Sequence, residues 1–111
     1  MAGKFELKKG GSGQFRFNFK AGNGEPILTS ESYRTKASAQ GGIESVKKHA
    51  AADANYERKA SAQGQPYFVL KAANGETIGT SEMYSSTSAR ESGITAVKAS
   101  APGATVVDLT G

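Results

Sequence analysis

The sequence predicts an α+β fold in which a β-β-β-α unit occurs twice about a pseudo-two-fold axis and is followed by a final C-terminal strand. Two observations carry this prediction. Residues 3–60 align with residues 54–111 without a gap, and twenty of the fifty-eight pairs are identical. Each copy also begins with runs that alternate between polar and apolar residues and ends with a helical period of 3.6 residues. We therefore expect each unit to form an antiparallel meander with one helix packed on it.

The length predicts a single compact domain over residues 1–111, with a first internal repeat at about residues 1–53 and a second at about 54–111. A unit of this size would bury only ~60% of its unfolded surface if it folded alone. The two repeats should therefore share one core. We expect the protein to be a monomer with internal pseudo-symmetry.

Three strands are predicted at the start of each unit. Residues 4–8 alternate between charged and apolar side chains, and residues 55–59 align with them. The second strand, residues 14–20, places three phenylalanines on one face and polar side chains on the other. These rings could form a stacking platform for bases, but we expect core packing because a half-buried strand needs one apolar face. Third strands at residues 25–30 and 76–81 complete the meanders.

The turn and cap residues fit this order of elements. Asn-Gly pairs at residues 23–24 and 74–75 predict type I′ hairpin turns, in which both central residues have positive φ. Ser88 and Glu91 have the spacing of a capping box at the start of the second helix. The apolar stripe recurs in both helices and consists of Ala39, Ile43, Val46 and Ala50 in the first copy and Ile94, Val97 and Ala101 in the second.

Two repeated features go beyond this pattern. Gly42 and Gly93 lie inside the helices, where glycine costs roughly 1 kcal/mol relative to alanine. Because the cost is found twice, we expect a close approach of each helix to the sheet or to the other helix. Residues 105–110 align with the first strand of each unit although no further unit follows. They are predicted to pair with a sheet edge and to bury Val107.

Two paired motifs resemble the YegP-like family of small bacterial proteins of unknown function. N-G-E-x-I-x-T-S-E-x-Y occurs at residues 23–33 and 74–84, and G-I-x-x-V-K occurs at residues 42–47 and 93–98. The resemblance covers nearly the whole chain and implies tandem β-β-β-α units and a bacterial origin. It implies no catalytic residues, because none is established for the family.

The repeated T-S-E-x-Y segment supplies the candidate ligand-binding residues. In a structural interpretation, serine and glutamate satisfy backbone amides where the strand ends, and the tyrosine ring closes the core. In a functional interpretation, the same side chains form two symmetry-related sites for a small polar or cationic ligand. The candidates are Ser30, Glu31 and Tyr33 in the first copy and Ser81, Glu82 and Tyr84 in the second.

The positive charge is concentrated in the first repeat. The chain has a net charge of +4; residues 1–53 carry nine Lys/Arg and five Asp/Glu, whereas residues 54–111 carry five of each. Phosphate contacts need such an excess of cations. Candidate contacts for a polyanion are Arg16, Lys20, Arg34 and Lys36.

No residue pattern predicts a catalytic site, a metal site or a cofactor. The chain has no cysteine, and His49 is its only histidine. The position of His49 at a helix end indicates an exposed residue that compensates the helix dipole. No run of residues has the length of a signal peptide or of a membrane span. We therefore expect a cytoplasmic protein that does not bind membranes.

Three function classes remain. Our first interpretation is a non-catalytic binding or interaction module whose partner is a small polar ligand or another protein. The alternative is weak nucleic-acid binding through the basic first repeat, which a steep salt dependence of the affinity would reveal. The third class is an enzyme, for which the sequence offers no catalytic constellation.

Overall fold

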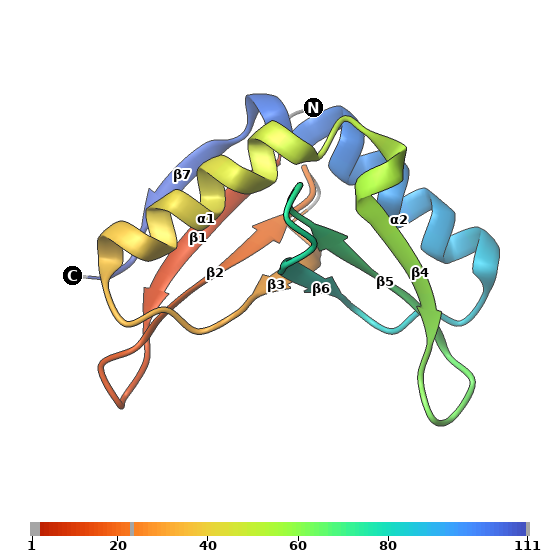
Figure 1. Ribbon diagram of the computed structural model, residues 1–111, viewed down its shortest axis with the longest axis horizontal. Helices are drawn as coiled ribbons and strands as arrows, with labels where there is room; N and C mark the ends of the chain where they lie inside the picture. The colour runs from red at the N-terminus through yellow and green to blue at the C-terminus, as the bar shows by residue number, and fades with distance from the viewer. Residues whose placement is uncertain (1–2, 23, 111) are drawn as a thin grey trace.

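The computed structural model describes residues 3–22 and 24–110. Their order, three strands and a helix twice and then a last strand, agrees with the sequence prediction (Figure 1). Short 3-10 turns at Asp53–Asn55 and Ala101–Gly103 follow the two helices. The elements are β1 (Lys4–Lys9), β2 (Phe15–Lys20), β3 (Pro26–Ser30), α1 (Lys36–His49), β4 (Tyr56–Ala60), β5 (Pro66–Lys71), β6 (Thr77–Ser81), α2 (Thr87–Ser100) and β7 (Thr105–Asp108).

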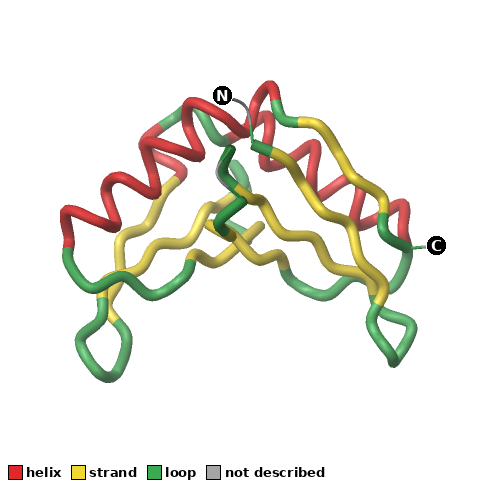
Figure 2. Tube along the Cα trace, turned by 180° about the vertical axis from the view of Figure 1, so that it is seen from behind, coloured by secondary structure: helices red, strands yellow, loops and turns green. Residues whose placement is uncertain are grey.

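One seven-stranded sheet in the order β4-β5-β6-β3-β2-β1-β7 joins the two repeats. The junction is the antiparallel pair β3–β6, in which Thr29 lies opposite Thr80. These two threonines are equivalent in the internal alignment, so the pseudo-two-fold axis passes between them. Figure 2 shows the molecule from behind, and its outline repeats that of Figure 1 because the half-turn exchanges the repeats. The predicted pseudo-two-fold fold is thus confirmed.

The last strand, β7, pairs in parallel with β1 at one edge of the sheet. The amide of Leu109 extends this pairing by donating to the carbonyl of Leu7 at 2.8 Å. Val107 is half-buried, and Ala104, just before the strand, is fully packed. The predicted edge strand is present. It makes the sheet asymmetric, because β4 forms the opposite edge without an equivalent partner among the described residues.

The core lies between the sheet and the two helices. Phe17 and Phe19 are completely buried, and Phe5 meets Phe17 edge to face with 5.9 Å between ring centroids. Phe17 and Phe19 are therefore committed to packing and cannot serve as a stacking platform for bases, whereas Phe15, the third phenylalanine of the strand, is half-buried. The helical stripes predicted from the sequence are all buried and face these strands.

Two local predictions were wrong. Asn74 does not have positive φ; only Gly75 does, at 86°, and its amide donates to the carbonyl of Ala72. The loop is thus a type I turn closed by a left-handed glycine, a common three-residue hairpin. Asn23 lies outside the described residues. The second helix is capped by Ser86, whose hydroxyl accepts from the amide of Ala89. The predicted capping box at Ser88 fails because the helix begins at Thr87, one residue earlier.

A candidate ligand site between the repeats

The serines of the T-S-E-x-Y segments complete the backbone hydrogen bonding at the end of each meander. Ser30 Oγ accepts from the amide of Phe17 at 2.9 Å and donates to the carbonyl of Glu31 at 2.8 Å. Ser81 makes the same two bonds with Phe68 and Glu82. Both serines are buried, and the single hydroxyl proton of each is already used. Their contacts match the structural interpretation.

Each tyrosine of the segment packs its ring between a phenylalanine and a helix. The Tyr33 ring stacks on Phe17 with 6.2 Å between centroids, and the Tyr84 ring stacks on Phe68 at 6.3 Å. The backbone of Tyr33 is also bonded in both directions to Phe15. Burial raises the pKa of both tyrosines, with a further contribution from nearby carboxylates. Both phenols are therefore neutral at physiological pH and can donate a hydrogen bond.

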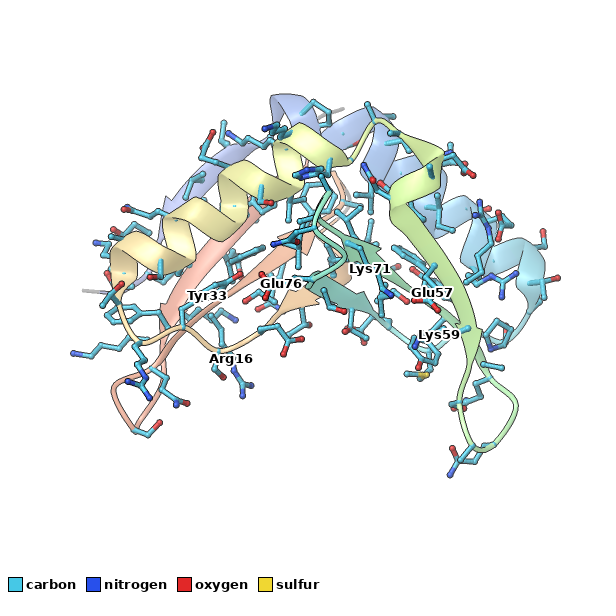
Figure 3. The ribbon with its side chains drawn as sticks, in the orientation of Figure 1. Arg16, Tyr33, Glu57, Lys59, Lys71 and Glu76 are labelled. Carbon is cyan, nitrogen blue, oxygen red and sulfur yellow. The ribbon has the colours of Figure 1, made fainter. Side chains whose placement is uncertain are left out.

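The edge of the Tyr33 ring borders a cleft of about 660 Å³, which we call the Tyr33 cleft. Figure 3 shows Tyr33 beneath α1 and Glu76 near the centre of the molecule, on the hairpin of the other repeat. Residues of both repeats thus form one site. The lining residues are Glu31, Tyr33, Gly42 and Ser45 from the first repeat and Val69, Ala72, Asn74, Glu76, Thr77, Ile78 and Thr80 from the second.

A smaller cleft of about 260 Å³ lies at the pseudo-symmetric position beside Tyr84. Six of its eight lining residues are equivalent, in the internal alignment, to lining residues of the Tyr33 cleft, and here too a helix from one repeat faces a hairpin from the other. We call it the Tyr84 cleft. It is lined by Tyr84, Ala89, Ser92 and Gly93 from the second repeat and by Ala21, Glu25, Pro26 and Ile27 from the first.

His49 links α1 to the loop between β5 and β6, which forms one wall of the Tyr33 cleft. Its Nδ1 donates to the carbonyl of Ser45 at 2.8 Å, and its Nε2 accepts from the amide of Ala73 at 3.3 Å. The expectation that His49 is exposed was wrong, because the side chain is half-buried and bonded at both nitrogens, although it lies in the last turn of α1 as predicted. Ser100 occupies the equivalent position in the second repeat.

The Tyr33 cleft is negative although the protein as a whole is basic. Glu31 and Glu76 contribute two carboxylates to its lining, and the described lining contains no basic residue. The side-chain amide of Asn74 donates to Glu76 Oε1 at 3.1 Å and orients this carboxylate. Coulomb attraction in such a cleft favours a cation over an anion.

Of the six candidate ligand residues, the structure brings only three to a cleft. Glu31 and Tyr33 line the Tyr33 cleft, and Tyr84 lines the Tyr84 cleft. Ser30, Ser81 and Glu82 do not appear in either lining. The hairpin residues of the cleft were not among the predicted candidates, because no local sequence pattern shows which hairpin faces which helix. The repeated Gly42 and Gly93 were a usable signal, since both lie against a tyrosine ring.

The four candidate polyanion contacts differ in whether they already have a carboxylate partner. Lys20 is paired with Glu6 at 2.9 Å, and Lys36 is paired with Asp108 on β7. Arg16 lies on β2, where its Nε donates to Ser32 Oγ at 2.8 Å, and Arg34 is exposed in the loop before α1. Two of the four cations thus already have a carboxylate partner.

The described part of the chain has neither a cluster of side chains suited to a metal ion nor a helix suited to span a membrane. Within residues 3–22 and 24–110, no group of three or more His, Cys, Asp or Glu side chains is placed to hold a metal ion. Neither α1 nor α2 is long and apolar enough to cross a membrane.

Comparison with known proteins identifies the family. The family model described as a domain of unknown function, DUF1508, matches the chain twice, over residues 11–57 and 61–108. The chain belongs to the DUF1508 family. The two matches correspond to the two structural repeats, and the resemblance noted from the N-G-E-x-I-x-T-S-E-x-Y motif is confirmed.

Full-length DUF1508 relatives are similar throughout. A UPF0339 protein of Acinetobacter baylyi is 53% identical over 111 residues, which cover all of both chains. The UPF0339 protein YegP of Escherichia coli K12 is 52% identical over 110 residues, which cover 99% of this chain and all of the relative. These relatives are themselves uncharacterised, and their names assign no activity.

Two solution NMR structures share the fold. The UPF0339 protein of Shewanella oneidensis has a TM-score of 0.93 at 50% identity and covers 99% of this chain and 93% of its own. YegP of E. coli, described as a protein of unknown function, has a TM-score of 0.94 at 52% identity, with coverage of 100% and 96%. The α+β fold with two helices and a mostly antiparallel sheet is therefore a property of the family.

Proposed function

We propose that this protein is a non-catalytic binding module whose Tyr33 cleft takes a small organic cation. The observation that carries the proposal is the composition of the cleft: a neutral tyrosine and two carboxylates, contributed by both repeats, in a protein of net positive charge. An ammonium group between these carboxylates gains Coulomb attraction from both of them. The smaller Tyr84 cleft, with Glu25 in its lining, is a second and weaker site of the same kind.

The volume of the Tyr33 cleft supports a small ligand. Clefts that hold small molecules range from ~300 to ~1,000 Å³, and about 660 Å³ lies within this range. The polar groups come from Ser45 and Asn74 as well as the carboxylates, whereas Val69 and Ile78 supply apolar wall. A ligand with a charged head and a short polar tail fits this mixture. We also propose that the protein acts in the cytoplasm, as expected from the sequence.

The test compares choline with its neutral isostere 3,3-dimethyl-1-butanol by NMR titration of the full-length labelled protein. Choline should shift the amides of Tyr33, Ser45 and Asn74, and the isostere should bind at least about fivefold more weakly, the loss expected for about 1 kcal/mol of charge attraction. Equal affinities for the two compounds, or shifts elsewhere only, would reject the proposal.

Matched variants locate the charge that is responsible. Glu76→Gln removes a cleft carboxylate without changing its shape, and we expect it to weaken choline binding by about threefold to tenfold. Glu44→Gln removes an exposed carboxylate of α1 outside the cleft lining and should leave the affinity unchanged. An equal effect of the two substitutions would mean that only the net charge of the protein matters.

A further inference from the structure

A second concave site lies on the sheet face that the helices leave open. It has a volume of about 440 Å³ and is bounded by β1, β2 and the turn that joins them. We call it the Arg16 pocket. Three basic side chains and no carboxylate line it, which is the opposite of the Tyr33 cleft. The lining consists of Lys8, Lys9, Gly10, Ser12, Gln14, Arg16, Asn18 and Thr29.

The strand register places two positive charges directly opposite one another in this pocket. Lys8 on β1 is the cross-strand partner of Arg16 on β2, so both side chains project from the same face. Like charges in such a pair destabilise a sheet. A local rule broken in this way often marks a functional position rather than a structural one.

Arg16 differs from Lys4, Lys8 and Lys20 on the same face of the sheet, because each of these lysines pairs with Glu6. A second like-charge pair on this face is Lys4 opposite Lys20, and Glu6, opposite Asn18, lies between the two like-charge pairs. The Glu6 carboxylate is 2.9 Å from Lys20, 3.5 Å from Lys4 and 3.7 Å from Lys8. Glu6 thus forms ion pairs with three lysines, whereas Arg16 has no carboxylate partner among the described residues.

The guanidinium of Arg16 is nonetheless held in place. Its Nε donates to Ser32 Oγ at 2.8 Å, which leaves the two Nη groups for a ligand. Beside it, the Asn18 amide donates to Thr29 Oγ1 at 2.9 Å, so the Thr29 hydroxyl keeps its own proton to donate. An oriented guanidinium with a hydroxyl and two ammonium groups nearby suits an oxyanion with several acceptor oxygens.

The second repeat provides an internal comparison. It retains the shared ion-pair framework: Glu57 lies 2.6 Å from Lys71 and 3.9 Å from Lys59. Figure 3 shows these three side chains together. However, Lys59 lies opposite Tyr67, the equivalent of Arg16, and no like-charge pair results. The same framework therefore folds without Arg16, and Arg16 is an addition that this fold does not require.

We propose that the Arg16 pocket binds a phosphate group. The Nη groups of Arg16 donate hydrogen bonds to the phosphate oxygens, and Lys8 and Lys9 add positive charge. The phosphate belongs either to a small phosphorylated molecule or to a nucleic-acid backbone, since both present the same oxygens. The site is independent of the Tyr33 cleft and would hold even if no organic cation bound there. Of the four polyanion contacts expected from the sequence, the proposal retains only Arg16, and it places the anion in one defined pocket.

The test is an NMR titration of the full-length labelled protein with inorganic phosphate at low ionic strength, using chloride as the reference anion. Phosphate should shift the amides of Ser12, Gln14 and Arg16 in a saturable manner. Arg16→Tyr, which copies the second repeat, should weaken phosphate binding at least about fivefold, as expected for loss of a charge-assisted contact. Arg16→Gln should do the same if the tyrosine variant proves unstable.

Lys48→Ala is the matched control, because it removes one exposed cation of α1 that does not line the pocket. It should change the affinity less than about twofold, since only long-range attraction is lost. A weakening equal to that of Arg16→Tyr, or the absence of saturable shifts in the wild type, would overturn the proposal.

A single-stranded thymidine octanucleotide separates the two sources of phosphate. If it displaces inorganic phosphate at lower concentration and its affinity falls steeply with salt, the pocket serves a nucleic-acid backbone. If it binds no more tightly than phosphate, the pocket serves a small phosphorylated molecule. Either result supports a phosphate site, provided that Arg16→Tyr weakens the binding clearly more than Lys48→Ala does.

Discussion

The ring of Tyr33 lies directly against the backbone of Gly42 on α1. A Cβ atom at position 42 would stand 2.8 Å from Tyr33 Cζ and 2.9 Å from Phe17 Cε2, closer than carbon atoms can pack. Gly93 has the same relationship with Tyr84, where a Cβ would stand 2.8 Å from Cζ. The glycine inside each helix is thus explained by the tyrosine at the end of each meander, and helix, ring and strand form one unit.

Gly42→Ala should destabilise the protein by about 1–3 kcal/mol, because the ring must move by an appreciable part of an ångström in a packed core. Alanine is intrinsically the better helix former, so the loss comes from packing alone. The control is its neighbour, Gly41, where an added Cβ meets no atom within 4 Å. Gly41→Ala should stabilise by about 0.5–1 kcal/mol. Urea denaturation measures both, and changes of the same sign would contradict the packing explanation.

Replacement of the tyrosines distinguishes packing from hydrogen bonding. Tyr33→Phe should change the free energy of unfolding by less than about 1 kcal/mol, because the ring is kept and the hydroxyl has no hydrogen-bond partner among the described residues. Tyr33→Ala should cost about 2–4 kcal/mol, somewhat less than a completely buried ring, because the side chain is half-buried. Tyr84 should respond alike, since its stacking and its glycine are equivalent. Thermal denaturation with an unchanged midpoint in both alanine variants would show that the rings contribute no packing.

Deletion of residues 104–111 should destabilise the whole fold. It removes β7, exposes the outer edge of β1 and breaks the ion pair between Lys36 and Asp108. We expect a lower urea midpoint together with loss of exchange protection in β1. Val106→Thr serves as a control, because this side chain is 41% exposed and the substitution keeps the strand. A truncated protein as stable as the wild type would show that β7 is dispensable.

The acid stability should depend on Asp53. Hydrogen bonds from Arg58 and then Lys98 lower the pKa of Asp53 from 3.8 to about 2. Because the folded-state pKa lies below the unfolded value, the ionised carboxylate stabilises the fold above about pH 4, and this contribution is lost as the pH falls toward 2. In Asp53→Asn the free energy of unfolding should therefore decline less between pH 4 and pH 2 than in the wild type. Parallel declines in the two proteins would refute the linkage.

The two repeats should behave as one domain. The β3–β6 pair joins them through backbone hydrogen bonds, and α1 of the first repeat contacts β5 and β6 of the second. We expect NMR relaxation to give one rotational correlation time for residues 3–53 and 54–110. Clearly different values would indicate two units that tumble separately, and the chain would then have to be described as two domains.

Local patterns were sufficient for much of this fold. Alternation along β2 identified its buried phenylalanines, and the stripe containing Ile43 identified the buried face of α1, because both depend only on side-chain spacing within one element. The turn type was predicted wrongly: Asn74-Gly75 suits two hairpin geometries, and the type I′ turn favoured from the sequence is not the one that forms. The cap of α2 was missed by two residues for a similar reason, since Ser86 and Ser88 are both competent caps.

The sequence by itself determined the repeat, the order of strands and helices, the core residues and the concentration of charge in the first half. All of these follow from composition and from periodicity over a few residues. Only the tertiary structure decided that Tyr33 shares a cleft with Glu76, that Lys8 lies opposite Arg16, and that β7 joins β1 in parallel. Such pairings join residues that are distant in the chain, and they are selected by the packing of whole elements, which leaves no signal in the local pattern.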